Sequence, residues 1–159
     1  MPMNFLFLCT GNSCRSILSE AVFNHLAPHG FKAISAGSRP TGRLNPDAVA
    51  QLQRHGIPVD GCASKSWHDL PLTPDVVVTV CGNAAGETCP AYLGNVVRTH
   101  WGLVDPSEVQ GTPAEIAAAF EATYAIVLAR VQALFALPLA ELAGDRAALK
   151  AALDRIGAC

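Results

Sequence analysis

The octet Cys9–Ser16, with the sequence CTGNSCRS, constrains this chain more than any other stretch. The apolar run of residues 4–8 comes directly before it, and the helix-like residues 17–23 come directly after it. A short loop between a strand and a helix turns successive backbone N–H groups inward, and the helix dipole adds partial positive charge. The octet therefore predicts a cradle for an oxyanion.

Three side chains of the octet are suited to binding such an anion or reacting with it. Arg15 offers a planar guanidinium that matches the oxygens of a tetrahedral oxyanion. The same positive field is expected to lower the pKa of Cys9 and make it a thiolate nucleophile. Ser16 is placed to donate a hydrogen bond to that thiolate, which would lower its pKa further. A buried cysteine with an incidental arginine is the alternative, and the flanking strand and helix argue against it.

Composition limits what the rest of the chain can be. The 159 residues, of which half are apolar and 15% are charged, predict one globular domain over residues 1–159. No basic stripe indicates a nucleic-acid partner, and no apolar run approaches the roughly 18 residues that a membrane span needs. The start of the chain does not look like a signal peptide, so a cytoplasmic location is expected. In that reducing compartment six cysteines indicate catalysis or metal binding.

Hydrophobic patterns predict a chain in which strands and helices alternate. Strands are predicted at residues 6–8, 31–36, 75–80 and 95–100, and helices at 16–26, 45–56, 112–138 and from 145 onward. This order indicates the α/β class: a four-stranded parallel sheet of order 2-1-3-4 with helices on both faces. Cys9, Cys81 and Asp105 each follow a strand, so the carboxyl edge of the sheet should bring them together.

The octet, with Asp105-Pro106 downstream, resembles the low-molecular-weight phosphotyrosine phosphatase fold. Within that fold the chain is similar to the thioredoxin-coupled arsenate reductases, because residues 81–90 (CGNAAGETCP) supply their two extra cysteines. The resemblance covers nearly the whole chain. It implies that Cys9 is the nucleophile, Arg15 the anion-binding arginine and Asp105 the general acid, and that Cys81 and Cys89 form a redox relay. The rest of the implied oxyanion-binding loop is Thr10, Gly11, Asn12, Ser13, Cys14 and Ser16.

This assignment agrees with thiol chemistry. Attack of Cys9 on the arsenic of arsenate, with Asp105 protonating the departing oxygen, gives a covalent cysteine–arsenic adduct. Attack of Cys81 on the Cys9 sulfur then expels arsenite and leaves a disulfide. Cys89 can next attack Cys81 and carry the disulfide to the surface, where thioredoxin reduces it. Bridged cysteines need Cα atoms within about 7 Å, so Cys89 has to move.

Cofactors and metals are not expected in this scheme, and the reductant is an external dithiol, thioredoxin. Glutathione with glutaredoxin stays open as the reductant. A structural zinc half-site is the alternative for Cys81 and Cys89, but the seven residues between them suit zinc poorly. A monomer is expected.

The main alternative is a phosphatase that uses Cys9, Arg15 and Asp105 on phosphotyrosine or another phosphomonoester. Phosphate and sulfate share the shape of arsenate and are expected to compete with it. Ile17 and Ser107 argue against this alternative, because the phosphatases commonly have proline and an aromatic residue there. A thiol sensor or arsenite-binding protein without catalysis is a third possibility.

One branch of the arsenate reductases holds potassium near the loop. The residues that match its site here are Asn12, Glu20 and Ser35, whereas Lys65 replaces an aspartate of that site. The Lys65 ammonium would occupy the cation position and neutralise Glu20. The resemblance therefore implies no potassium requirement for this chain.

Overall fold

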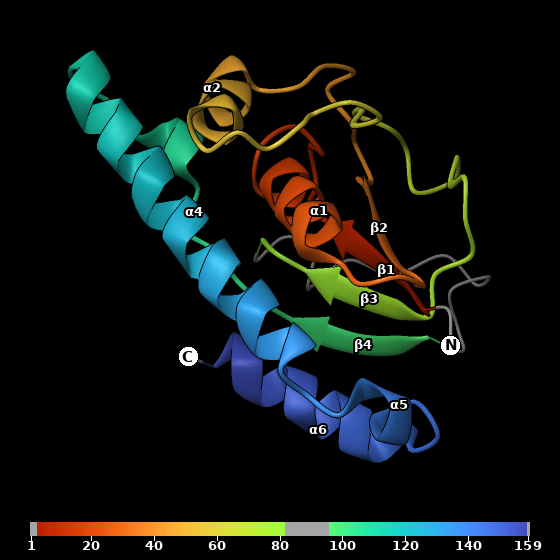
Figure 1. Ribbon diagram of the computed structural model, residues 1–159. Helices are drawn as coiled ribbons and strands as arrows, with labels where there is room; N and C mark the ends of the chain where they lie inside the picture. Colours follow the sequence, from red (N-terminus) through yellow and green to blue (C-terminus); the bar gives the residue numbers. More distant parts are fainter. Residues whose placement is uncertain (1–2, 82–95, 159) are drawn as a thin grey trace.

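The computed structural model describes residues 3–81 and 96–158 (Figure 1). Helices and strands follow one another along the chain much as predicted, with two short helices added late in the chain. The elements are β1 (Met3–Leu8), α1 (Arg15–Leu26), β2 (Phe31–Ala36), α2 (Pro46–Arg54), β3 (Val76–Thr79), β4 (Val97–His100), the 3₁₀ helix η2 (Pro106–Glu108), α4 (Pro113–Phe135), α5 (Leu139–Leu142) and α6 (Arg146–Gly157).

The four strands form one parallel sheet of order β2-β1-β3-β4, which confirms the predicted order. The register places Leu8 opposite both Ala36 and Thr79, and Thr79 opposite His100. All four strands therefore end at one edge of the sheet. β1 pairs with β2 on one side and with β3 on the other, so the chain leaves β1 at the switch point where ligands bind in such sheets.

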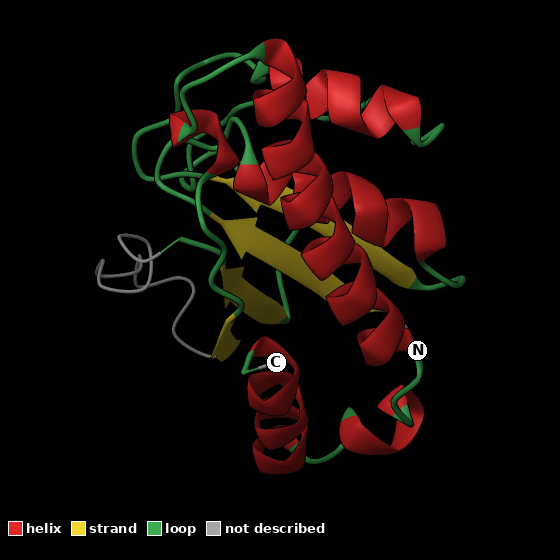
Figure 2. Ribbon diagram, turned by 90° about the vertical axis from the view of Figure 1, so that its left-hand side faces the viewer, coloured by secondary structure: helices red, strands yellow, loops and turns green. Residues whose placement is uncertain are grey.

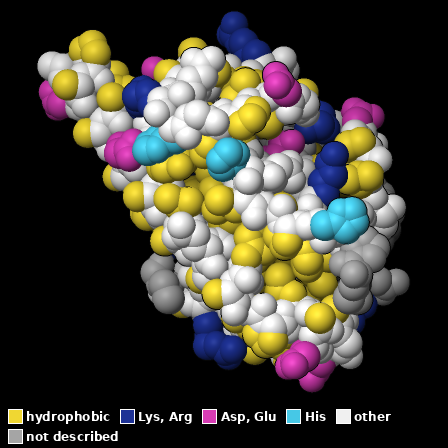
Figure 3. Space-filling model, in the orientation of Figure 1, with side chains coloured by type: hydrophobic (Ala, Val, Ile, Leu, Met, Phe, Trp, Pro, Cys, Tyr) yellow, Lys and Arg dark blue, Asp and Glu magenta, His cyan; other side chains and the backbone are white. Residues whose placement is uncertain are grey.

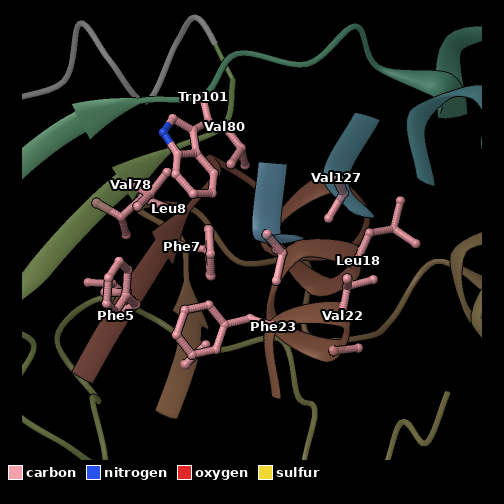
Figure 4. Packing of buried hydrophobic residues seen from close by; sticks show 14 of the residues in the cluster. Phe5, Phe7, Leu8, Leu18, Val22, Phe23, Val78, Val80, Trp101 and Val127 are labelled. Carbon is pink, nitrogen blue, oxygen red and sulfur yellow. The ribbon is translucent and has the colours of Figure 1, made fainter. Parts of the chain in front are cut away.

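Helices cover the sheet face that carries Phe5, Phe7 and Val78. Phe23 of α1 lies against both phenylalanines, with ring centroids 5.0 Å from Phe5 and 5.9 Å from Phe7. Val127 of α4 reaches the same cluster (Figure 4), and Figure 2 shows the helices gathered on this side of the sheet. The predicted cover of the sheet by helices is thus seen for this face.

The last helix, α6, packs along β4. Thr99 Oγ1 donates to Asp154 Oδ1 at 2.7 Å, and Trp101 Nε1 donates to the carbonyl oxygen of Leu153 at 3.0 Å. Lys150 Nζ donates to the carbonyl oxygen of Arg98 at 2.8 Å. These bonds fix α6 to the strand and to the segment that leads to Asp105.

Three predicted helix starts are confirmed by their caps. The Asn45 side chain accepts from the backbone N–H groups of the first turn of α2, and the Asp145 side chain does the same for α6. Thr112 and Glu115 form a reciprocal capping box at the start of α4. Each cap satisfies N–H groups that a helix cannot pair internally, which is why these helices begin where the sequence places them.

By length and composition alone, α4 is apolar enough to cross a membrane. Of its most apolar stretch, 39% is buried inside the protein, and its core residues include Phe120, Val127 and Val131. Hydrophobic side chains also lie on the surface shown in Figure 3. Ile126 of α4 is 44% exposed. Packing against the rest of the protein explains why one face of α4 is apolar.

Candidate active site

The octet forms the connection between β1 and α1, as predicted. The backbone N–H of Cys9 donates to the carbonyl oxygen of Ala36 at 3.3 Å, which holds the start of the loop against β2. At the other end Leu18 N donates to the carbonyl oxygen of Cys14 at 2.9 Å, within the first turn of α1. Asn12, between them, has a φ of 45°, a left-handed conformation that curls the loop. We call residues 9–16 the oxyanion loop.

Residues 37–45, which we call the strap, hold the outside of the oxyanion loop. Three backbone N–H groups of the strap donate to loop carbonyl oxygens: Arg39 to Thr10 at 3.0 Å, Thr41 to Gly11 at 3.0 Å and Asn45 to Ser13 at 2.8 Å. With these carbonyls drawn outward, the N–H groups of the same loop are left to line its inside. Gly37 opens the strap, and a Cβ there would collide with the carbonyl oxygens of Cys9 and Thr10.

A buried polar network supports the loop from behind. Asn12 Nδ2 donates to Ser16 Oγ and to Ser35 Oγ, both at 2.9 Å, and its Oδ1 accepts from the Lys65 backbone N–H at 2.8 Å. Ser35 Oγ donates in turn to Glu20 Oε1. Ser16 Oγ accepts from Asn12 in this network, so its own O–H stays available for the bond to the Cys9 thiolate that sequence analysis predicts. The network therefore fixes the left-handed residue that shapes the loop.

Lys65, the residue that the resemblance relates to a cation site, lies beside this network. Its Nζ donates to the carbonyl oxygens of Ser35 at 2.8 Å and Ala63 at 2.9 Å. Its charge lowers the pKa of Glu20, as does the Ser35 hydrogen bond, but burial is the largest effect and the pKa of Glu20 stays raised. The expected neutralisation of Glu20 is thus only partial. Among residues 3–81 and 96–158, no group of three or more acidic, histidine or cysteine side chains is arranged to hold a metal ion.

Cys81 lies beside Cys9, at the end of β3. Both are free thiols and both are buried, Cys9 being 6% exposed and Cys81 3%. The two side chains are hydrogen-bonded to each other. The backbone N–H of Thr10 lies 3.5 Å from Cys81 Sγ, and Thr10 Oγ1 lies 3.7 Å from it. The predicted meeting of these two cysteines at one edge of the sheet is present in the structure.

The same contact reverses the expected acidity of Cys9. The hydrogen bond with Cys81 and burial raise the pKa of Cys9 well above its ordinary value, and they outweigh the Arg15 charge and the Gly11 N–H, which lower it. The prediction of a lowered pKa is therefore wrong. It counted the positive field of the loop but not the neighbouring thiol, which disfavours a second negative charge in a buried site.

Arg15 and Asp105 complete the group of side chains at this edge. Arg15 Nη1 donates to the carbonyl oxygen of Leu103 at 3.1 Å, and Arg15 Nη2 lies 3.4 Å from Asp105 Oδ2. Among the residues that the structure describes, the buried Arg15 Nε has no hydrogen-bond partner. The other carboxylate oxygen, Asp105 Oδ1, accepts from Ser107 N at 2.9 Å and from Ser107 Oγ at 2.6 Å. A guanidinium with an unused N–H and an adjacent carboxyl suit the binding and protonation of an oxyanion.

The remaining cysteines divide into two groups. Cys14 is buried in the oxyanion loop, and burial and the Asp105 charge raise its pKa to about 12, so its thiol stays protonated. Burial also raises the pKa of Cys62, to about 12. Cys89, the third cysteine of the expected relay, lies outside the described residues.

Sequence analysis missed the strap and the contacts of Ser107. The strap has the composition of a plain connection, with Pro40 and Gly42, and no residue type in it signals hydrogen bonding to a loop earlier in the chain. Ser107 was noted only as a departure from the phosphatases. A serine two residues after an aspartate is the one local signal, because that spacing lets it donate to the carboxylate.

A broad groove of about 520 Å³ lies elsewhere, between α4 and α6. Alanine and isoleucine side chains line most of it, including Ala129, Ala133 and Ile156. It contains none of the thiol or carboxyl groups described above. We therefore place the candidate site by its chemistry, at the oxyanion loop.

Comparison with known protein families agrees with this site. Residues 4–148 match the family model for low molecular weight phosphotyrosine protein phosphatase. The chain belongs to this family. The match includes the oxyanion loop, the strap, Cys81 and Asp105, and it ends inside α6.

Relatives within the phosphatase family include arsenate reductases. The arsenate reductase of Shouchella clausii is 43% identical over 110 residues, which cover 69% of this chain and 78% of that protein. A solved structure of an arsenate reductase in its phosphate-binding state is 26% identical, with a TM-score of 0.70, and the match covers 84% of this chain and 97% of that one. A thioredoxin-dependent arsenate reductase of Corynebacterium glutamicum is 25% identical, with a TM-score of 0.55, over 82% of this chain and 62% of that chain.

Proposed function

We propose that this protein is an arsenate reductase that converts arsenate to arsenite. The observation that carries the proposal is the position of Cys81, whose thiol is hydrogen-bonded to that of Cys9 inside an oxyanion-binding site. A phosphatase needs one nucleophilic thiol, whereas reduction of bound arsenic needs a second thiol within reach of the first. The names of the relatives support the same activity.

The first step is formation of a covalent adduct. Arsenate enters the oxyanion loop and is held by inward N–H groups and by Arg15, whose Nε has no other partner. Cys9 gives its proton to the oxyanion and attacks arsenic. The sulfur–arsenic bond forms as an arsenic–oxygen bond breaks, and Asp105 protonates the departing hydroxide to water.

The second step transfers two electrons to arsenic. Cys81, as thiolate, attacks the Cys9 sulfur, and the sulfur–arsenic bond breaks with its electron pair remaining on arsenic. Arsenite leaves, and the two sulfur atoms are oxidised to a Cys9–Cys81 disulfide. No domain motion is needed for this step, because the Cys81 thiol is already hydrogen-bonded to that of Cys9. Cys89 then attacks Cys81, frees Cys9 and leaves a Cys81–Cys89 disulfide.

The reductant in this proposal is thioredoxin. A dithiol of that class takes the Cys81–Cys89 disulfide back to two thiols by exchange. The thioredoxin dependence of the C. glutamicum protein supports this choice. We also propose that the enzyme needs no potassium, because the Lys65 ammonium already binds the carbonyl oxygens of Ser35 and Ala63.

The test is arsenate-dependent consumption of NADPH with thioredoxin and thioredoxin reductase, compared with glutathione and glutaredoxin. Turnover with the thioredoxin pair, lost in Cys89→Ser and kept in the matched variant Cys159→Ser, supports the three-cysteine relay. Unchanged turnover in Cys89→Ser excludes the relay. Turnover with glutaredoxin alone assigns the reductant to glutathione.

The second candidate is a phosphatase, because the loop, Arg15 and Asp105 suit a phosphomonoester equally well. Hydrolysis of p-nitrophenyl phosphate by Cys89→Ser, with arsenate reduction absent in the wild-type protein, would favour this candidate.

A further inference from the structure

We propose that Ser107 is a positioning residue for the acid: its hydroxyl holds Asp105 so that the transferable proton sits on Oδ2, the oxygen that faces the oxyanion loop. This inference rests on the proposed function, because it assigns the side chain that orients the acid of that reaction.

The two oxygens of the Asp105 carboxyl have different surroundings. Oδ1 accepts two hydrogen bonds from one residue, from Ser107 N at 2.9 Å and from Ser107 Oγ at 2.6 Å. Oδ2 faces Arg15 Nη2 across the longer distance of 3.4 Å. The carboxyl group is therefore fixed at one oxygen and turned toward the loop arginine with the other.

This difference decides where a proton can sit. Oδ1 already accepts two hydrogen bonds, from Ser107 N and Ser107 Oγ, so a proton on Oδ1 would occupy one of the two lone pairs and displace one of these donors. A proton on Oδ2 leaves both Ser107 bonds intact. When an oxyanion binds, the Arg15 guanidinium has it as a closer partner, and Oδ2 is left on the loop side to donate to the departing oxygen.

The side chain of Ser107 bonds the acid and is not needed for the fold. The Asp105 side chain caps η2 by accepting from the backbone N–H of Ser107. Any residue other than proline would supply that N–H. The residue is exposed, in contrast to the buried Pro106 beside it, so its side chain adds nothing to the core. Ser107→Ala therefore removes one hydrogen bond to Oδ1 and keeps the cap, and the variant is expected to fold normally.

The test uses the first turnover of the fully reduced protein, which needs no external reductant. Arsenate is mixed with wild-type protein, Ser107→Ala, Ser107→Thr and Ser66→Ala, and the loss of free thiols is followed over time. Ser66 is the control, because its hydroxyl also makes one local hydrogen bond, which it accepts from the His68 N–H, away from the acid. We expect Ser107→Ala to lower the rate constant at saturating arsenate about tenfold, the size typical of one hydrogen bond. The half-saturating arsenate concentration should change less than twofold, and Ser107→Thr should restore most of the rate.

The outcomes separate this inference from the proposed function. A wild-type rate in Ser107→Ala overturns the role of Ser107, and so does an equal loss in Ser107→Ala and Ser107→Thr, which indicates a structural effect. A wild-type protein that loses no thiols to arsenate overturns the proposed function instead. In that case the same variants are compared in hydrolysis of p-nitrophenyl phosphate, where the departing phenolate needs the same acid and the same tenfold difference is expected. Absence of that difference overturns the inference there too.

Discussion

The oxyanion loop and the acid segment, residues 101–107, meet at one site but are held in different ways. Backbone bonds from the strap and a buried network around Asn12 fix the loop on two sides. The acid segment continues the backbone bonding of β4 only as far as Leu103, whose N–H donates to the carbonyl oxygen of Val80 at 3.0 Å. Val104 is then 86% exposed, and the Asp105 carboxylate is held by the side chains of Arg15 and Ser107 and by the Ser107 N–H.

This difference separates binding from proton transfer. The cradle for the anion is built by the same backbone bonds that fold β1, β2 and the strap, so it exists before any ligand arrives. The acid depends on two side chains, Arg15 and Ser107, one of which belongs to the binding site itself. Damage to the loop should therefore cost binding, stability and chemistry together, whereas damage to the acid segment should cost chemistry alone.

The largest effect is expected from Arg15→Lys. Lysine keeps the charge but loses the planar fork that bonds the oxyanion and the carbonyl oxygen of Leu103. We expect kcat/KM for arsenate to fall about 10³-fold, the upper range for loss of a preorganised anion donor. Arg146→Lys, at the distant start of α6, is the matched control and should keep its activity. Retained activity in Arg15→Lys would mean that charge alone suffices at this position.

Asp105→Asn should affect the chemical step only. An amide cannot donate the proton that the departing oxygen needs, and loss of a general acid costs about 10²-fold in rate. We expect kcat to fall by that factor while the half-saturating arsenate concentration and the melting temperature change little. Glu108→Gln, in the same 3₁₀ helix, is the control. A large loss of arsenate binding in Asp105→Asn would show that the acid segment is also part of the cradle.

Gly37→Ala should break the strap. Its Cβ would collide with the carbonyl oxygens of Cys9 and Thr10, so the backbone of one segment has to move. Such overpacking costs about 1–3 kcal/mol in the free energy of unfolding, which urea denaturation measures. Anion binding should weaken as well, because the displaced carbonyls belong to the loop. Gly144→Ala is the matched control, since the nearest atom to its Cβ would be 3.9 Å away, and equal destabilisation of both variants would contradict the prediction.

Cys81→Ala should make Cys9 more acidic. Cys81 is the largest cause of the raised pKa of Cys9, and its removal leaves the Arg15 charge and the Gly11 N–H acting against burial alone. Because the pKa of Cys9 is raised, alkylation of Cys9 in the wild-type protein should need a higher pH than that of an ordinary thiol. In Cys81→Ala the alkylation profile of Cys9, followed with iodoacetamide and mass spectrometry, should shift to lower pH. The Cys14→Ala profile should match wild type, and an unmoved Cys81→Ala profile would remove the thiol pair from the explanation.

The smallest effect is expected from potassium. Replacing sodium chloride by potassium chloride at constant ionic strength should leave turnover and melting temperature unchanged, because Lys65 Nζ already bonds the carbonyl oxygens of Ser35 and Ala63. Lys65→Asp should create a potassium dependence. A wild-type protein activated by potassium but not by sodium would contradict the assignment of Lys65.

Local signals account for what the sequence predicted well. The order of strands and helices follows from hydrophobic periods and from caps such as Asn45 and Thr112, which act within a few residues. The edge that gathers Cys9, Cys81 and Asp105 follows from the rule that parallel strands end together. These inferences need no knowledge of which side chains touch.

The errors lie where distant segments meet. The acidity of Cys9 depends on the thiol of Cys81, 72 positions later, and a single neighbour reversed the expected direction. The network behind the loop, in which Asn12 bonds both Ser16 and Ser35 of β2, was likewise not predicted. A pattern along the chain gives residue types and spacing, but pKa values and hydrogen-bond partners depend on contacts that form only in the fold.

The position of α6 has a consequence for solubility. β4 is an outer strand, and an outer strand offers unpaired backbone groups to which another chain can add a strand and start aggregation. Lys150 occupies one such group, the carbonyl oxygen of Arg98, with its ammonium. Gly157 lies so close to the carbonyl oxygen of His100 that no Cβ would fit between them. The last turns of α6, beyond residue 148 where the family match ends, thus shield the open side of the sheet from other copies of the chain.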